Sequence, residues 1–153
     1  MRPTDGVIHD LKIAKSLLDL AHPRQRSYSD FHMDILVFGN AAYSPDSLPL
    51  RILPDLRQRL PGNRFLALDP NEEWEVSGDL TVIDTVINLN RPMIFRSLDA
   101  FRTSPRCSTH DFDALAQLRL LSKLGRIGRV TVIGLPPRLS EAAALDFITD
   151  ALA

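Results

Sequence analysis

Several features are absent from this chain of 153 residues, and each absence excludes a class of protein. The single cysteine, Cys107, excludes an intramolecular disulfide and a thiol-coordinated zinc site. There is no run of about 18 apolar residues, so no membrane-spanning helix is predicted, and the N-terminus lacks the basic and apolar regions of a secretory signal. The formal net charge of −1 gives no electrostatic basis for binding nucleic acid or an anionic membrane. We therefore expect a cytoplasmic protein with neither kind of partner.

The motifs of several enzyme classes are missing as well. No Gly-x-Gly-x-x-Gly follows the first apolar run, and no Gly-x4-Gly-Lys-Ser/Thr occurs, which leaves dinucleotide and P-loop binding without a basis. The serine-hydrolase motif Gly-x-Ser-x-Gly is also absent. Cys107 stands three residues before His110, but a lone cysteine in a loop is more often incidental than a nucleophile.

The length fits one domain, preceded by an extension. Residues 7–21 place apolar side chains at helical spacing, and residues 22–31 are polar. We expect residues 1–32 to form a helical extension and linker, and residues 33–153 to form the domain. No long unmatched apolar stripe remains, so we expect a monomer.

Short apolar runs, typical of strands buried on both faces, alternate with amphipathic helices. The runs cover residues 35–38, 65–68, 80–83, 93–95 and 130–134. Helices are predicted over 48–60 with a bend at Pro54, over 110–124 with a stop at Gly125, and after Ser140. In the helix at 110–124 we expect the apolar side chains to point inward, namely Phe112, Leu115, Leu118, Leu121 and Leu124. This order predicts an α/β fold, a three-layer α/β/α sandwich around a mostly parallel five-stranded sheet. The strand at 93–95 follows a short connection, so we expect it to be antiparallel.

Polar residues follow the predicted strands where their carboxyl ends meet, which is where open α/β sheets bind ligands. Asn40 and Asp46 follow the first strand, Asp69 the second and Asp84 the third, and His110 begins a helix. Carboxylates with an imidazole suit a divalent ion such as zinc or nickel. Three protein ligands would leave a position open for water or substrate.

Each of these residues also has a purely structural interpretation. Asp46 could cap the helix that follows it, and Asp111 could cap the helix at 110–124. Asp84 could simply meet solvent at the end of its strand, and His110 could be an ordinary first-turn residue. Spacing alone leaves both interpretations open.

Four segments, taken in order, resemble the hydrogenase maturation protease family over residues 33–137. They are ILVFGN at 35–40 with PDSLPL at 45–50, VIDTV at 82–86, STHDFD at 108–113, and VIGLP at 132–136. The resemblance implies a phosphorylase/hydrolase-like fold. It also implies an endopeptidase that cuts a C-terminal peptide from the large-subunit precursor of a nickel–iron hydrogenase, once nickel has been inserted.

The resemblance assigns the catalytic and metal-binding roles to Asp46, Asp84 and His110. The nickel would be supplied by the substrate, while zinc or another divalent ion could occupy the isolated protein. Asn40, Asp69 and Asp111 are the candidates for a supporting role behind these ligands.

The chain departs from the family pattern after the second strand. Better-known members have Asp-Gly-Gly-Thr there, whereas Asp69 is followed by Pro70 and Asn71, and two glycines allow a closer backbone approach than these residues do. An alternative hypothesis is therefore a non-catalytic nickel-checking or docking protein for hydrogenase assembly. A third is an unrelated binding module in which the three residues are ordinary caps.

Overall fold

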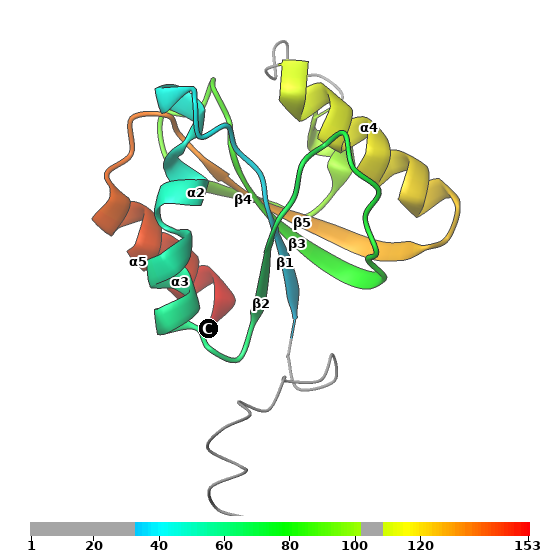
Figure 1. The fold of residues 1–153 in the computed structure, drawn as a ribbon, viewed down its shortest axis with the longest axis horizontal. Coiled ribbons are helices and arrows are strands. Elements are labelled where there is room, and N and C mark those ends of the chain that lie inside the picture. Colours follow the sequence, from blue (N-terminus) through cyan, green and yellow to red (C-terminus); the bar gives the residue numbers. More distant parts are fainter. Residues whose placement is uncertain (1–32, 102–108) are drawn as a thin grey trace, which may run out of the picture. The chain divides into compact units, whose positions relative to one another are not determined.

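The computed structural model describes residues 33–101 and 109–153, without the side chains of 101 and 109–113 (Figure 1). The expected N-terminal extension and Cys107 lie outside the described residues. Among the described helices, none has the length and apolar character needed to cross a membrane.

Five strands form one sheet in the order β2-β1-β3-β5-β4. They are β1 (Asp34–Val37), β2 (Arg64–Ala67), β3 (Gly78–Thr85), β4 (Met93–Phe95) and β5 (Ile127–Leu135). The first four strands in this order pair in parallel, and β4 pairs antiparallel with β5. The predicted antiparallel member is thereby confirmed. It cannot pair with β3, the strand before it in the chain, because both edges of β3 are occupied by β1 and β5.

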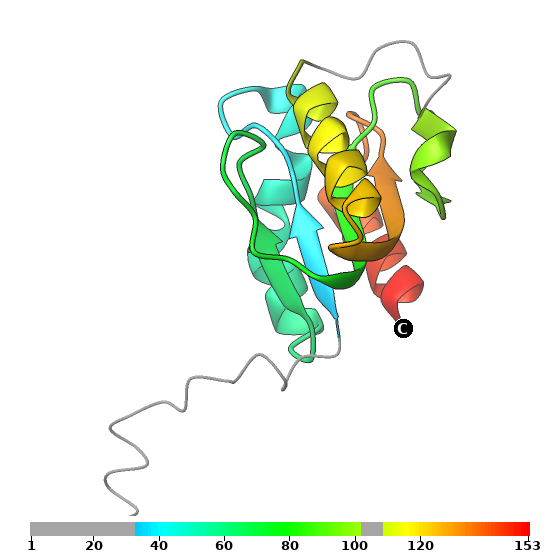
Figure 2. The ribbon, with the colours of Figure 1, turned by 90° about the vertical axis from the view of Figure 1, so that its right-hand side faces the viewer.

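Helices cover both faces of the sheet, which confirms the predicted three-layer α/β/α architecture (Figures 1 and 2). The helical elements are the 3-10 turns η2 (Ser44–Asp46) and η3 (Leu98–Phe101) and the helices α2 (Leu48–Arg51), α3 (Leu53–Arg59), α4 (Thr109–Lys123) and α5 (Glu141–Leu152). Alternation along β1 sends Ile35 and Val37 to a core with α2, α3 and α5. Leu36 and Phe38 enter a second core with α4.

Local sequence signals explain how the helices begin and end. The predicted bend at Pro54 is confirmed, because the helix is interrupted at Ile52 and a proline stands in the first turn of both α2 and α3. Ser140 caps α5 by accepting a hydrogen bond from the backbone N–H of Ala143 at 3.3 Å.

The end of α4 differs from the prediction in one respect. Leu118 and Leu121 are buried as expected, but Leu124 is 62% exposed. The expectation that Leu124 points inward was wrong because α4 ends at Lys123. The chain then turns at Gly125, whose φ of 67° is accessible mainly to glycine.

Candidate active site

The carboxyl ends of β1 and β3 form the point at which the chain direction in the sheet reverses. After β1 the chain passes through α2 and α3 to β2, on one side of β1, whereas after β3 it continues to β4 and β5 on the other side. Loops that leave neighbouring parallel strands in opposite directions open a crevice, and this is where open α/β sheets bind ligands. The upper edge of the sheet in Figure 1 is therefore the candidate site.

Asp46 reaches this edge from the loop that follows β1. It is the last residue of η2 and only 7% exposed. Its backbone carbonyl accepts a hydrogen bond from the N–H of Asn40 at 3.0 Å, which closes the loop on itself. Ser47, not Asp46, occupies the N-cap position of α2. Asp46 is therefore a buried carboxylate and not the cap of the helix that follows.

Gly39 allows the loop to close because a side chain would not fit there. A Cβ at this position would lie 2.6 Å from the carbonyl oxygen of Asp46 and 3.3 Å from Cγ of Leu50. The glycine thus sets how closely the Asp46 backbone approaches the end of β1.

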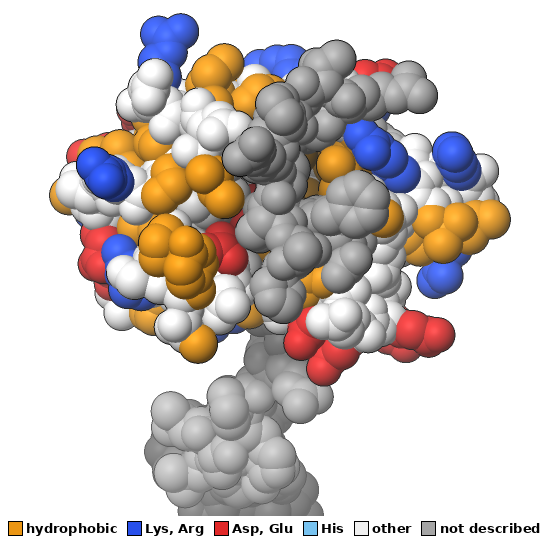
Figure 3. Space-filling view, turned by 90° about the horizontal axis from the view of Figure 1, so that it is seen from above, with side chains coloured by type: hydrophobic (Ala, Val, Ile, Leu, Met, Phe, Trp, Pro, Cys, Tyr) orange, Lys and Arg blue, Asp and Glu red, His pale blue; other side chains and the backbone are white. Residues whose placement is uncertain are grey.

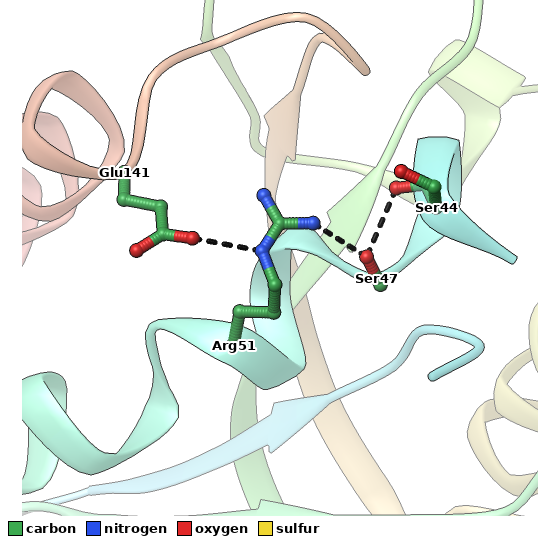
Figure 4. A network of polar contacts seen from close by, with 4 residues as sticks. All are labelled: Ser44, Ser47, Arg51 and Glu141. Carbon is green, nitrogen blue, oxygen red and sulfur yellow. Dashed lines mark hydrogen bonds and ion pairs between the residues drawn. The ribbon is translucent and has the colours of Figure 1, made fainter. Parts of the chain in front are cut away.

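A polar network fixes the loop from the other side (Figure 4). The Ser47 hydroxyl donates to the carbonyl of Ser44 at 2.9 Å and accepts from Nη1 of Arg51 at 2.5 Å. Nε of the same arginine donates to Oε1 of Glu141 at 2.8 Å. Arg51 therefore ties η2 and α2 to the first turn of α5. Sequence reasoning missed this network, since Glu141 is 90 residues away from Arg51 and no local pattern connects them.

Asp84 is the penultimate residue of β3 and is half-buried. The N–H of Phe38 donates to the carbonyl of Ile83 at 3.0 Å, so Asp84 lies one residue beyond this β1–β3 hydrogen bond. Alternation along β3 places it on the face of Val82, which packs in the core with α4. One carboxylate oxygen, Oδ1, accepts from the N–H of Thr85 at 2.8 Å.

Thr85, beside Asp84, has a buried hydroxyl that sequence reasoning also missed. The residue is 2% exposed, and its Oγ1 has no hydrogen-bond partner within the part of the chain that the structure describes. A buried hydroxyl in this state carries an unrecovered desolvation cost of about 1–3 kcal/mol. No sequence signal distinguishes this threonine from an ordinary strand residue.

A cavity of about 330 Å³ opens between the loops that follow β1 and β2. Its lining includes Asn40, Asp46 and Asp69, so three of the predicted polar residues meet there, while Asp84 is not part of the lining. His110 is the second residue of α4, one turn before Ala114, which does line the cavity. The side chains of His110 and Asp111 lie outside the described residues.

Asp69 is held in a local turn at the rim of this cavity. Its Oδ1 accepts from the backbone N–H and from the side-chain amide of Asn71, both at 2.9 Å. Its carbonyl accepts from Nε1 of Trp74 at 2.9 Å. The Trp74 ring is buried and lies 5.2 Å from the Phe38 ring, centroid to centroid. Trp74 thus anchors the turn to the α4 side of the sheet.

The carboxylates at the sheet edge are chemically suited to a divalent ion, since oxygen donors bind such ions well. Among the side chains that the structure describes, no three His, Cys, Asp or Glu residues form a metal-binding group. The three-ligand set Asp46, Asp84 and His110 therefore stays a prediction. Figure 3 views the molecule from the side of these strand ends, where the described surface carries both acidic and basic side chains.

Comparison with known proteins gives a result at the level of the fold. The sequence matches no model of a protein family and no curated protein. Among solved structures, the hydrogenase maturating endopeptidase HybD from E. coli is similar with a TM-score of 0.57 and 16% identity, over 78% of this chain and 89% of that chain.

Two further structures agree. The hydrogenase 3 maturation protease has a TM-score of 0.57 and 16% identity, over 77% of this chain and 87% of that one. The solution structure of an endopeptidase from Escherichia coli has a TM-score of 0.54 and 18% identity, over 78% of this chain and 90% of that one. Identities this low establish the fold alone, and the fold of this chain is the one found in hydrogenase maturation endopeptidases.

Proposed function

We propose that this protein is a metal-dependent endopeptidase that removes a C-terminal peptide from the nickel-loaded large-subunit precursor of a nickel–iron hydrogenase. One observation carries the proposal. Two carboxylates were assigned as ligands from sequence resemblance: Asp46 lies in η2, in the loop that follows β1, and Asp84 lies at the end of β3, and these two strands flank the direction reversal of the sheet. The fold, shared with structures named as hydrogenase maturation endopeptidases, supports it further.

The proposed chemistry is hydrolysis of one peptide bond next to the substrate's nickel. Asp46 and Asp84 would offer oxygen ligands and His110 a nitrogen ligand to this ion. With the substrate held in this way, a polarised water adds across the bond. The large subunit keeps the new carboxylate, and the released peptide carries the new amine.

The surrounding residues have supporting roles in this proposal. Asn40 closes the Asp46 loop through its backbone. Asp69, whose carboxylate is oriented by Asn71, and Asp111 are the candidates for a general base. Zinc or another divalent ion is the proposed occupant of the isolated protein, which we expect to act as a cytoplasmic monomer.

A non-catalytic protein that checks or docks nickel-loaded precursor is the second candidate. The turn from Asp69 to Asn71 favours it, because Pro70 and Asn71 line the cavity, at the place where the family that the sequence resembles is expected to have two glycines. Their side chains occupy space that a glycine backbone would leave to the substrate. In this interpretation the protein keeps the metal ligands and binds the precursor but does not cleave it.

The proposal is tested by incubating purified nickel-loaded precursor with the wild-type protein, with Asp46→Asn and with Asp84→Asn. Loss of a ligand charge should slow processing at least about 100-fold, judged by the mobility of the large subunit on a gel. Asp150→Asn serves as the matched control, since Asp150 is an exposed residue of α5. Precursor without nickel should not be cut by any of the proteins.

The outcomes separate the candidates. Equal processing by wild type and both site variants would rule out the assigned site. Precursor that binds to the wild type in a pull-down but is never shortened would establish the non-catalytic candidate. If the wild-type protein neither binds nor cleaves the precursor, the remaining interpretation is an unrelated binding module.

A further inference from the structure

A second cavity, of about 530 Å³, lies apart from the candidate active site. It is formed by η3 and the residues before it, by the second half of α4, and by the start of β5, which lie on the same side of the molecule in Figure 2. Its charged lining residues are Arg96, Asp99, Arg119, Lys123 and Arg129.

This cavity is at the opposite end of the sheet from Asp84. Gly128 lines it, whereas Gly134, six residues further along β5, is the register partner of Asp84. Val130, four residues before Gly134, lines it as well, so at about 3.3 Å per residue the cavity lies about 13–20 Å from the level of Asp84. A ligand in this cavity would therefore occupy a site distinct from the candidate active site.

Four cations and one carboxylate line the cavity, in a chain whose formal net charge is −1. Arg129 pairs with Asp79, whose Oδ2 lies 3.2 Å from Nη2, and Nη2 of Arg119 donates to the Leu98 carbonyl at 3.3 Å. The hydrogen bond from the Arg129 backbone lowers the pKa of Asp79, and the guanidinium lowers it further. Among the described residues, no carboxylate forms an ion pair with Arg96 or Lys123.

The residues that line the cavity favour one class of anion over others. It contains the C-terminal end of α4, where outward-pointing carbonyls repel a small anion that approaches the backbone. Asp99 interrupts the cations, so the cavity offers no continuous track of positive charge for a phosphate backbone. Long arginine and lysine side chains spaced around an open hollow instead suit separate carboxylates carried on one flexible chain.

We propose that this basic cavity is a docking site for an acidic segment of a polypeptide partner. The contacts would be charge-assisted hydrogen bonds from Arg96, Arg119 and Lys123 to Asp or Glu side chains. The inference does not depend on peptidase activity, because nothing in it involves the carboxyl edge of the sheet.

The test measures binding of a short fluorescein-labelled peptide of alternating Glu and Gly to the full-length protein by fluorescence anisotropy. The double variant Arg96→Gln/Lys123→Gln should weaken binding about fivefold or more, since exposed charge pairs each contribute modestly. The double variant Arg91→Gln/Arg138→Gln loses the same charge from exposed positions outside the cavity and should bind like wild type. Thermal unfolding confirms that both variants fold.

Two further probes complete the experiment. Added NaCl should weaken peptide binding progressively, as expected of contacts between exposed charges, and inorganic phosphate should compete no better than chloride at equal ionic strength. The proposal is overturned if the peptide does not bind or if both double variants weaken it equally. It is also overturned if phosphate displaces the peptide at low concentration, or if a labelled oligothymidylate binds more tightly than the peptide.

Discussion

At the scale of single residues, the candidate site depends on one glycine. Gly39 lies in the loop that follows β1, and the backbone carbonyl of Asp46 packs directly against it. A Cβ atom on residue 39 would clash with this carbonyl oxygen. Because the clashing atom belongs to the backbone, the loop and not a flexible side chain would have to move. The position of Asp46 is therefore sensitive to the smallest possible substitution next to it.

We predict that Gly39→Ala displaces the Asp46 loop. The added methyl group would lie 2.6 Å from the Asp46 carbonyl oxygen, so the free energy of unfolding should fall by about 1–3 kcal/mol, as for other overpacked positions. Urea denaturation measures this change, and the precursor assay should show loss of processing.

Gly78→Ala is the control for backbone strain without a clash. Gly78 has a φ of 75°, and a Cβ added to it would meet no heavy atom within 4 Å. It begins β3, at the end of the strand away from Asp84. The strained φ should cost about 1–2 kcal/mol of stability, while processing stays normal. Normal processing by Gly39→Ala would show that the close approach to Asp46 is not needed.

At the scale of elements, Arg51 connects the site to a distant helix. Two ion pairs join the α2–α3 region to α5: Arg51 with Glu141, and Arg59 with Asp146, at 2.8 and 2.9 Å. Only Arg51 also contacts Ser47, the residue after Asp46. The two arginines therefore offer matched positions that differ in their connection to the site.

We predict that Arg51→Met and Arg59→Met each lower the free energy of unfolding by about 1 kcal/mol or less, because both ion pairs are partly exposed. Only Arg51→Met should slow precursor processing, by about tenfold, since η2 loses its link to α5. Denaturant unfolding and the gel assay give the two readouts. If the two variants process precursor at the same rate, the network has no positioning role.

At the scale of the whole molecule, two cores share one sheet. Leu56 of α3 belongs to the first core and Leu118 of α4 to the second, and both are buried. Trp74, the single tryptophan, lies in the second core. Because the strands of the sheet contribute side chains to both cores, neither layer should persist without the other.

We predict that Leu56→Ala and Leu118→Ala each lower the free energy of unfolding by about 2–5 kcal/mol. Each should also shift a single cooperative transition. Trp74 fluorescence and circular dichroism should report the same midpoint in both variants. The prediction fails if Leu56→Ala leaves the Trp74 transition unmoved, which would mean that the two layers unfold independently.

The sequence by itself determined the elements of the fold and their order. Continuous apolar runs identify the strands, Pro54 interrupts a helix, and Gly125 and Ser140 mark helix ends, because these signals act through neighbouring backbone. The alternation of strands and helices then leaves few architectures besides a mostly parallel sheet with helices on both faces. Leu124 escaped prediction because a shift of one residue at a helix end changes which way a side chain points.

Only the tertiary structure decided which elements are neighbours. Strand order places β1 next to β3, so Asp46 and Asp84 lie at one reversal of the sheet, while β4 pairs with β5. The Arg51–Glu141 pair and the basic cavity join residues far apart in the chain, and no local pattern encodes such contacts. The physical reason is that periodicity records which face of an element is buried, whereas the neighbours on that face are set by how all the elements pack together on the two faces of the sheet.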